Sequence, residues 1–144
     1  MRLVVTDACI FIDVIELQLT RKFFGLEFEV PTTIDVINEL YPNQQEILRA
    51  FERAGKLTIH ILSAEEQMEI AKQNFSRSLS PEDASVIFTA LRLNATILSS
   101  DKPVRTFSKK LAIEYHGMLW IFVISFLVLS CCQLKKRYLN LIYW

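Results

Sequence analysis

Along this chain, short apolar runs alternate with stretches whose apolar side chains recur at helical spacing. Runs that are continuously apolar, or that alternate between apolar and polar residues, predict five strands: residues 3–5, 26–30, 57–62, 95–98 and 118–123. Apolar positions that recur every three or four residues predict the helices between them: residues 10–17, 31–40, 44–54, a helix that begins at residue 64, and residues 81–93 and 102–115.

Polar residues mark where several of these helices begin and end. Ser63 and Glu66 have the three-residue spacing of a capping box, in which each side chain bonds the other residue's backbone N–H group. Ser80 and Asp83 have the same spacing at the start of a later helix. Gly55 has the position of a C-terminal helix cap. These signals support the predicted helix boundaries.

The alternation of strands and helices is typical of an α/β fold whose parallel sheet is covered on both faces. The sequence therefore predicts a three-layer α-β-α domain with a mostly parallel central sheet over residues 1–122. Residues 123–144 are predicted to form an apolar, helical C-terminal tail. In open sheets of this kind, ligands bind beyond the carboxyl ends of the strands.

Acidic residues lie where such a fold would bind a ligand. Asp7 directly follows the first predicted strand, and Asp101 comes shortly after the fourth. Asp83 lies in the first turn of its helix, and Glu39 lies near the end of another. Each has an ordinary explanation, because the three aspartates could cap helices and Glu39 could be a solvated surface residue. Four carboxylates that converge would repel one another unless cations neutralise them, and hard oxygen ligands favour Mg²⁺ or Mn²⁺.

Four segments of the chain resemble the acidic motifs of a known family. They read V-V-T-D-A-C-I-F-I-D, then I-N-E-L, then L-S-P-E-D-A-S-V-I-F-T-A-L, then A-T-I-L-S-S-D-K-P-V-R. In this order they resemble the four motifs of PIN domains, whose largest group is the bacterial and archaeal VapC-type toxins. The segment H-G-M-L-W-I-F is similar to the last strand of one bacterial branch, so the resemblance covers residues 1–122.

Carried over by position, the resemblance implies that Asp7, Glu39, Asp83 and Asp101 are the catalytic, metal-binding acids, with Asp7 as the candidate to bridge two ions. It implies hydrolysis of RNA phosphodiester bonds, with Mg²⁺ or Mn²⁺ as cofactor. This chemistry is consistent with two-metal catalysis, in which the ions activate a water and stabilise the charge of an in-line displacement. RNA is then the substrate, and an antitoxin protein or a second copy in a homodimer is the expected protein partner.

Residues near Asp101 are candidates for substrate binding. Lys102 and Arg105 could contact a phosphate. Ser99 and Ser100 could donate to a carboxylate or to the substrate, or could be plain loop hydroxyls. Charged pairs elsewhere would extend a basic rim, although such pairs are usually solvated: Arg21, Lys22, Lys109 and Lys110.

Composition modifies this interpretation in two ways. The net charge is zero, from 16 basic and 16 acidic residues, which is not typical of a nucleic-acid-binding protein. If cations occupy four carboxylates, however, 12 acidic residues remain against the 16 basic ones. The three cysteines, Cys9, Cys131 and Cys132, give no disulfide framework, which favours a reducing cytoplasm.

Two other function classes compete with a nuclease. Phosphatases of the haloacid-dehalogenase type need D-x-D after the first strand, and this chain has Asp7-Ala8-Cys9. A PIN fold that binds RNA or protein without cutting would not need all four acids.

Ala8 is a departure from the family, because many members have Ser or Thr at this position and so gain a hydroxyl contact.

The C-terminal region has a separate interpretation as a membrane segment. Residues 118–134 form an apolar run that precedes a basic segment at 135–137, as in a membrane span with a cytoplasmic flank. If residues 118–122 are a strand, the remaining residues of the run form a helix of about 18 Å, against about 30 Å of hydrocarbon. We therefore expect a cytoplasmic protein, with membrane association through residues 118–134 as the alternative.

Overall fold

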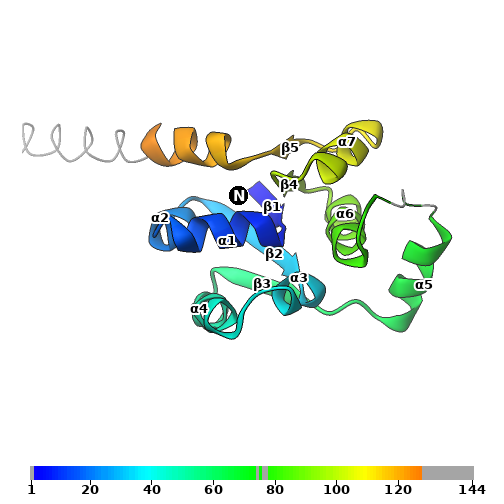
Figure 1. Ribbon diagram of the computed structural model, residues 1–144, viewed down its shortest axis with the longest axis horizontal. Helices are drawn as coiled ribbons and strands as arrows, with labels where there is room; N and C mark the ends of the chain where they lie inside the picture. The colour runs from blue at the N-terminus through cyan, green and yellow to red at the C-terminus, as the bar shows by residue number, and fades with distance from the viewer. Residues whose placement is uncertain (1, 74, 76–77, 128–144) are drawn as a thin grey trace, which may run out of the picture.

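A parallel sheet lies at the centre of the protein. The computed structural model describes residues 2–73, 75 and 78–127. Within them the sheet has the strand order β3-β2-β1-β4-β5, and neighbouring strands all pair in parallel (Figure 1). The strands are β1 (Arg2–Thr6), β2 (Phe28–Thr33), β3 (Leu57–His60), β4 (Thr96–Leu98) and β5 (Tyr115–His116).

Helices lie on both sides of this sheet. In Figure 1, α1, α2, α4 and a helix over residues 118–127 lie in the left half of the view, and α5, α6 and α7 lie in the right half. The predicted α/β fold with three layers and a parallel sheet is therefore confirmed. The helices are α1 (Ala8–Glu16), α2 (Thr20–Phe24), α3 (Ile34–Asn38), α4 (Pro42–Arg53), α5 (Ala64–Lys72), α6 (Pro81–Leu93), α7 (Lys102–Lys110) and the helix 118–127, which is orange in Figure 1.

The core forms where the central strands meet the apolar faces of their flanking helices. Val4 and Val5 of β1 and Ile97 and Leu98 of β4 are fully buried. Each fully buried side chain of this size contributes about 1.5–3 kcal/mol through removal of apolar surface from water. The same core includes buried residues of α1 and α6. These contacts fix the relative position of the carboxyl ends of β1 and β4.

Both predicted capping boxes are present. The Ser63 hydroxyl accepts the Glu66 backbone N–H at 3.1 Å, and the Glu66 carboxylate accepts the Ser63 N–H at 3.3 Å. Ser80 and Asp83 exchange the same pair of bonds at 3.1 and 3.2 Å. Together they fix the first turns of α5 and α6.

The predicted helix 31–40 begins too early in the chain. Pro31 lies within β2 and pairs in register with Thr58 of β3. The helix begins only at Ile34, after Thr33, whose hydroxyl accepts the Val36 backbone N–H at 3.3 Å. The proline favours an extended residue before it, and the threonine supplies the cap, so the strand continues to Thr33.

The helix predicted over residues 102–115 ends too late in the chain, and the strand predicted over residues 118–123 is wrong. The helix α7 ends at Lys110, Ala112 has a positive φ of 55°, and Tyr115–His116 forms the last strand. Residues 118–127 are helical. A strand would place Leu119 and Ile121 on one face, but Leu119 is 78% exposed and Ile121 is 1% exposed. A continuously apolar run has no period that separates strand from helix, and packing decides between them.

Trp120 attaches the helix 118–127 to the sheet. Its ring stacks on His116 of β5 with centroids 4.1 Å apart, and on Phe28 of β2 with centroids 5.7 Å apart. The Arg2 guanidinium lies 5.4 Å from the centroid of the same ring and also pairs with Glu114. This stack connects residues from both ends of the described chain.

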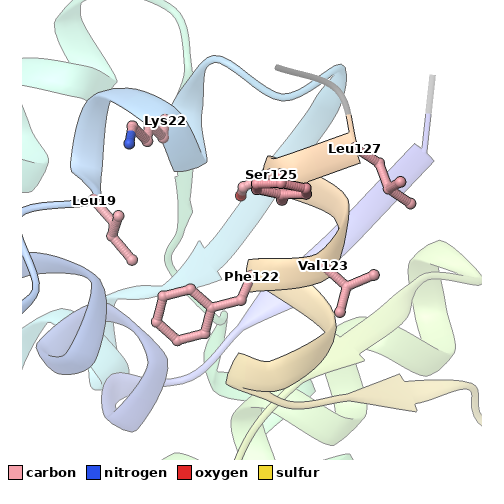
Figure 2. A pocket seen from close by; sticks show the side chains of 7 residues that line it. Leu19, Lys22, Phe122, Val123, Ser125 and Leu127 are labelled. Atoms are coloured by element: carbon pink, nitrogen blue, oxygen red, sulfur yellow. The ribbon is translucent and has the colours of Figure 1, made fainter. Parts of the chain in front are cut away.

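Beside this helix lies a groove of about 500 Å³ (Figure 2). Leu19 and Lys22 line one side, and residues 122–123 and 125–127 of the helix line the other. Phe122 points toward Leu19 in Figure 2. Phe126 is 72% exposed. Within the part of the chain that the structure describes, no helix has the length and apolar character needed to cross a membrane. The rest of the predicted apolar run, residues 128–134, and the basic segment 135–137 lie outside the described residues.

Candidate metal centre

Three of the four predicted acids meet at the carboxyl edge of the sheet. Asp7, Asp83 and Asp101 each offer one carboxylate oxygen, and these oxygens lie within 4.8 Å of one another. Asp7 follows β1, Asp83 lies in the first turn of α6, and Asp101 precedes α7. The predicted convergence of these three residues is therefore present in the structure.

The register between β1 and β4 explains how Asp7 reaches this position. Thr6 pairs with Leu98, and the Asp7 backbone N–H donates to the Leu98 carbonyl at 3.2 Å. The Asp7 carboxylate also caps α1, because Oδ1 accepts the Ile10 N–H at 3.3 Å. Burial, followed by the charge of Asp101, raises the Asp7 pKa to about 6, although hydrogen bonds from neighbours oppose this shift. The side chain is 3% exposed, so its ionised form is costly without a cation.

Asp83 combines a structural role with its place in the cluster. Oδ2 accepts the Ser80 backbone N–H, as the capping box requires. Burial, followed by the charges of Asp101 and Glu82, raises the Asp83 pKa, while its bonds to Ser80 lower it. The capping interpretation of this residue and its metal-binding interpretation are therefore compatible.

Asp101 is the exposed member of the group. It stands at the N-cap position of α7, yet its carboxylate makes no capping bond among the described residues. Its backbone N–H donates to the Ser99 hydroxyl at 3.1 Å, which fixes the main chain. The carboxylate itself thus remains available for a ligand.

Glu39 lies outside the group of three but close enough to be influenced by it. The residue is the C-cap of α3, and its side chain is exposed. Burial of its carboxyl group, followed by the charges of Glu82, Asp83, Asp7 and Asp101, raises the Glu39 pKa to about 7. The exposed side chain argues for a modest desolvation effect, so we attribute the direction mainly to the surrounding carboxylates. Glu82 was not predicted, and only its position directly before Asp83 in the sequence points to it.

Cys9 is a second residue that the sequence did not single out. Its thiol donates to Asp7 Oδ1 at 2.7 Å, and its sulfur accepts the Ser100 backbone N–H at 3.3 Å. The position two residues after Asp7, in the first turn of α1, is the available sequence signal. This thiol gives Asp7 a side-chain contact although Ala8 lacks a hydroxyl.

The predicted substrate-binding residues occupy different environments. Ser99 is fully buried, and its hydroxyl accepts the Asp101 backbone N–H, so it holds the main chain at the acidic cluster. Ser100, Lys102 and Arg105 are exposed near the cluster. The Arg105 guanidinium lies 5.3 Å from the centroid of the Tyr115 ring. The two predicted basic residues therefore reach solvent on the α7 side of the site.

The chemistry of this donor set fits a hard divalent cation. All three grouped ligand atoms are carboxylate oxygens, which favour Mg²⁺ or Mn²⁺. Burial and neighbouring carboxylates both raise the pKa values of Asp7 and Glu39, so the ionised carboxylates are disfavoured here without a cation. A cation would relieve the repulsion and favour the ionised carboxylates.

A family model described as a PIN domain (DUF3368) matches residues 3–126. The chain is a PIN-domain protein. The resemblance inferred from the four acidic motifs is thereby confirmed. No curated protein matches this PIN domain.

Solved PIN-like structures share the fold at low sequence identity. A PilT N-terminus domain protein, SSO1118, from Sulfolobus solfataricus P2 is 17% identical, with a TM-score of 0.64 over 85% of this chain and 92% of that chain. PAE2754 from Pyrobaculum aerophilum is 13% identical, with a TM-score of 0.59 over 86% and 95% of the two chains. VapBC2 from Rickettsia felis, solved with a DNA fragment from its promoter, is 12% identical, with a TM-score of 0.53 over 80% and 98%.

Proposed function

We propose that this PIN domain is a metal-dependent endoribonuclease that hydrolyses phosphodiester bonds in RNA. The observation that carries the proposal is the approach of the Asp7, Asp83 and Asp101 oxygens to within 4.8 Å of one another. Family membership supports nuclease chemistry in general, because PIN domains are generally metal-dependent nucleases. RNA, rather than DNA, is the substrate implied by the motif resemblance.

In this proposal Asp7, Asp83 and Asp101 hold Mg²⁺ or Mn²⁺, and Glu39 adds a fourth negative charge at the edge of the site. A bound cation supplies an activated water and stabilises negative charge on the phosphate as the bond breaks. The protein's own contribution is rigidity. The Ile10 N–H and the Cys9 thiol orient Asp7, and Ser80 orients Asp83. Metal-binding side chains that are already oriented lose little conformational entropy when the substrate binds.

The decisive test is a cleavage assay with single-stranded RNA in Mn²⁺, in Mg²⁺ and in EDTA. We expect cleavage by the wild type only with metal, and a loss of at least about a hundredfold for Asp101→Asn, because a charged metal ligand becomes neutral. Asp13→Asn is the matched control, because Asp13 lies on α1 and is not a member of the group of three acids. Equal cleavage by Asp101→Asn and wild type would refute the proposal.

The same assay separates the competing functions. A PIN fold that only binds RNA or protein would retain RNA without cutting it, and calorimetry would detect no carboxylate-dependent Mn²⁺ binding. A phosphatase would release phosphate from a phosphomonoester and leave the RNA chain intact. Both outcomes contradict a nuclease.

A more specific proposal is that this PIN domain is the toxin of a toxin–antitoxin pair in the cytoplasm. Its support is the motif resemblance to VapC-type toxins and the shared fold with VapBC2 of Rickettsia felis. An antitoxin protein is then the partner, and a homodimer is the expected assembly. Induced expression of the chain in a bacterial host should arrest growth, and Asp101→Asn should relieve the arrest. Unimpaired growth with active, soluble protein would contradict the toxin assignment.

A further inference from the structure

The exposed face of α7 carries a concentration of positive charge beside the acidic cluster. Its nine residues, K-P-V-R-T-F-S-K-K, include four cations and no acid. Val104 and Ser108 are buried on the opposite face, which turns the cations toward solvent. The helix, at the upper right of Figure 1, begins directly after Asp101. In a chain with no net charge, this is a marked local excess.

These cations are not neutralised by acids within the described residues. None of Lys102, Lys109 and Lys110 takes part in an ion pair there. Arg105 contacts the Tyr115 ring and also forms no ion pair with an acid among residues 2–73, 75 and 78–127. An anion could therefore approach this face without breaking an existing ion pair.

A recess of about 240 Å³ lies on this face. Lys102 and Lys110 contribute to its lining from the first and last turns of α7, about 12 Å apart along the helix axis. Thr106 lies between them and adds a hydroxyl group. Pro103 and Phe107 provide apolar lining, and Phe107 packs against Phe75 with ring centroids 5.3 Å apart. Ser78 completes the lining. Two cations, hydroxyl groups and an apolar wall match the chemistry of a phosphate attached to a sugar.

We propose that this recess binds a phosphate of the nucleic-acid strand beside the bond that is cut, with Lys102, Lys110 and Thr106 as its donors. The assignment of this strand as RNA rests on the proposed function. Phosphate contacts position a strand without reading its sequence. The recess would thus set the direction in which the strand leaves the acidic cluster, along α7.

Two neighbouring lysines distinguish a phosphate site in this recess from general electrostatic attraction. Lys109 and Lys110 are adjacent, exposed and equally charged in the last turn of α7, but only Lys110 lines the recess. A diffuse positive field would respond equally to the loss of either residue. A built phosphate site would respond mainly to the loss of Lys110.

The test measures binding of a fluorescein-labelled single-stranded oligoribonucleotide by anisotropy, with Mg²⁺ present. All variants carry Asp7→Asn, so that cleavage does not interfere. We expect Lys110→Gln to raise Kd about fivefold and to reduce the slope of log Kd against log salt by about 0.7, as for one lost phosphate contact. Thr106→Val should raise Kd by about twofold, since it removes a neutral donor. Lys109→Gln should change Kd by less than about twofold, because exposed single charges contribute little. The same is expected of Lys56→Gln, because Lys56 is exposed directly before β3 and does not line the recess.

Equal effects of Lys109→Gln and Lys110→Gln, or no effect of either, would overturn the proposal. The same holds if the Asp7→Asn protein does not bind RNA. The proposed nuclease activity is judged separately, by metal-dependent cleavage with the wild type. If the wild type cleaves RNA but Lys110→Gln does not change Kd, only the phosphate-site proposal is refuted. If Lys110→Gln raises Kd but the wild type does not cleave RNA, only the nuclease proposal is refuted.

Discussion

The thiol of Cys9 donates a hydrogen bond to Oδ1 of Asp7, with 2.7 Å between sulfur and oxygen. Burial, followed by the charge of Asp7, raises the Cys9 pKa to about 12. The group therefore stays protonated at neutral pH, where it is a donor and not a nucleophile. Since Oδ1 also accepts the Ile10 N–H, two donors hold this carboxylate in one orientation.

We predict that Cys9→Ala weakens both Mn²⁺ binding and RNA cleavage by about tenfold, the lower range for loss of a residue that orients a metal ligand. Cys9→Ser keeps a donor at this position, so its affinity should stay within about threefold of the wild type. Isothermal titration with Mn²⁺ and the cleavage assay check both values. Wild-type behaviour of Cys9→Ala would show that the Ile10 N–H is sufficient to orient Asp7.

A second prediction concerns the stability of the metal-free protein. The pKa of Asp7 rises from 3.8 to about 6 on folding, and that of Glu39 rises from 4.5 to about 7. A carboxyl group whose pKa is raised on folding contributes its full stabilisation at a pH below its pKa in the unfolded state. This contribution is lost as the pH rises through its pKa in the folded state. In EDTA, the free energy of unfolding should therefore fall between about pH 4 and pH 7.

Asp7→Asn should remove the Asp7 part of this loss. At pH 8 in EDTA, we expect the free energy of unfolding of Asp7→Asn to exceed that of the wild type by about 1–3 kcal/mol. Mn²⁺ should no longer stabilise this variant. Asp13→Asn should show no gain. Urea unfolding with and without Mn²⁺ gives these values, and a destabilised Asp7→Asn protein at pH 8 would contradict the assigned cause.

A third prediction compares the two capping boxes. Ser63→Ala and Ser80→Ala should each reduce the free energy of unfolding by about 1 kcal/mol, because each removes a helix N-cap. Only Ser80 bonds a member of the acidic cluster, namely Asp83. Ser80→Ala should therefore also lower Mn²⁺ affinity and cleavage, whereas Ser63→Ala should leave both unchanged. Equal activities of the two variants at a temperature where both are folded would separate Asp83 from the metal centre.

The fourth prediction tests the attachment of the helix 118–127. Trp120→Ala removes stacking on both Phe28 and His116 and should cost about 2–4 kcal/mol of stability. Leu119→Ala is the matched control, because Leu119 is 78% exposed, and it should cost less than about 0.5 kcal/mol. Chemical denaturation of both variants checks this order, and a larger loss for Leu119→Ala would contradict the helical placement.

The sequence alone predicted those parts of the site that depend on local rules. Asp7 follows a buried run, and Asp101 comes three residues after another, so a parallel sheet brings them to one edge. Asp83 was predictable from the capping spacing to Ser80 and from the motif resemblance. The hydrogen bond from Cys9 to Asp7 was not predicted, because it forms only when the first turn of α1 brings the thiol back to Oδ1.

The tertiary structure alone decided the identity of the C-terminal segment. Residues 118–123 are all apolar, so their pattern fits a buried strand as well as a helix. The outcome depended on distant partners, since Trp120 stacks on Phe28 of β2 and Ile121 enters the core. Amino-acid order determined the alternation of elements, the helix caps and the acids at the strand ends, because these follow from interactions between neighbours. Burial of the Asp7 carboxylate and the helix 118–127 arose only when remote segments packed together and excluded water.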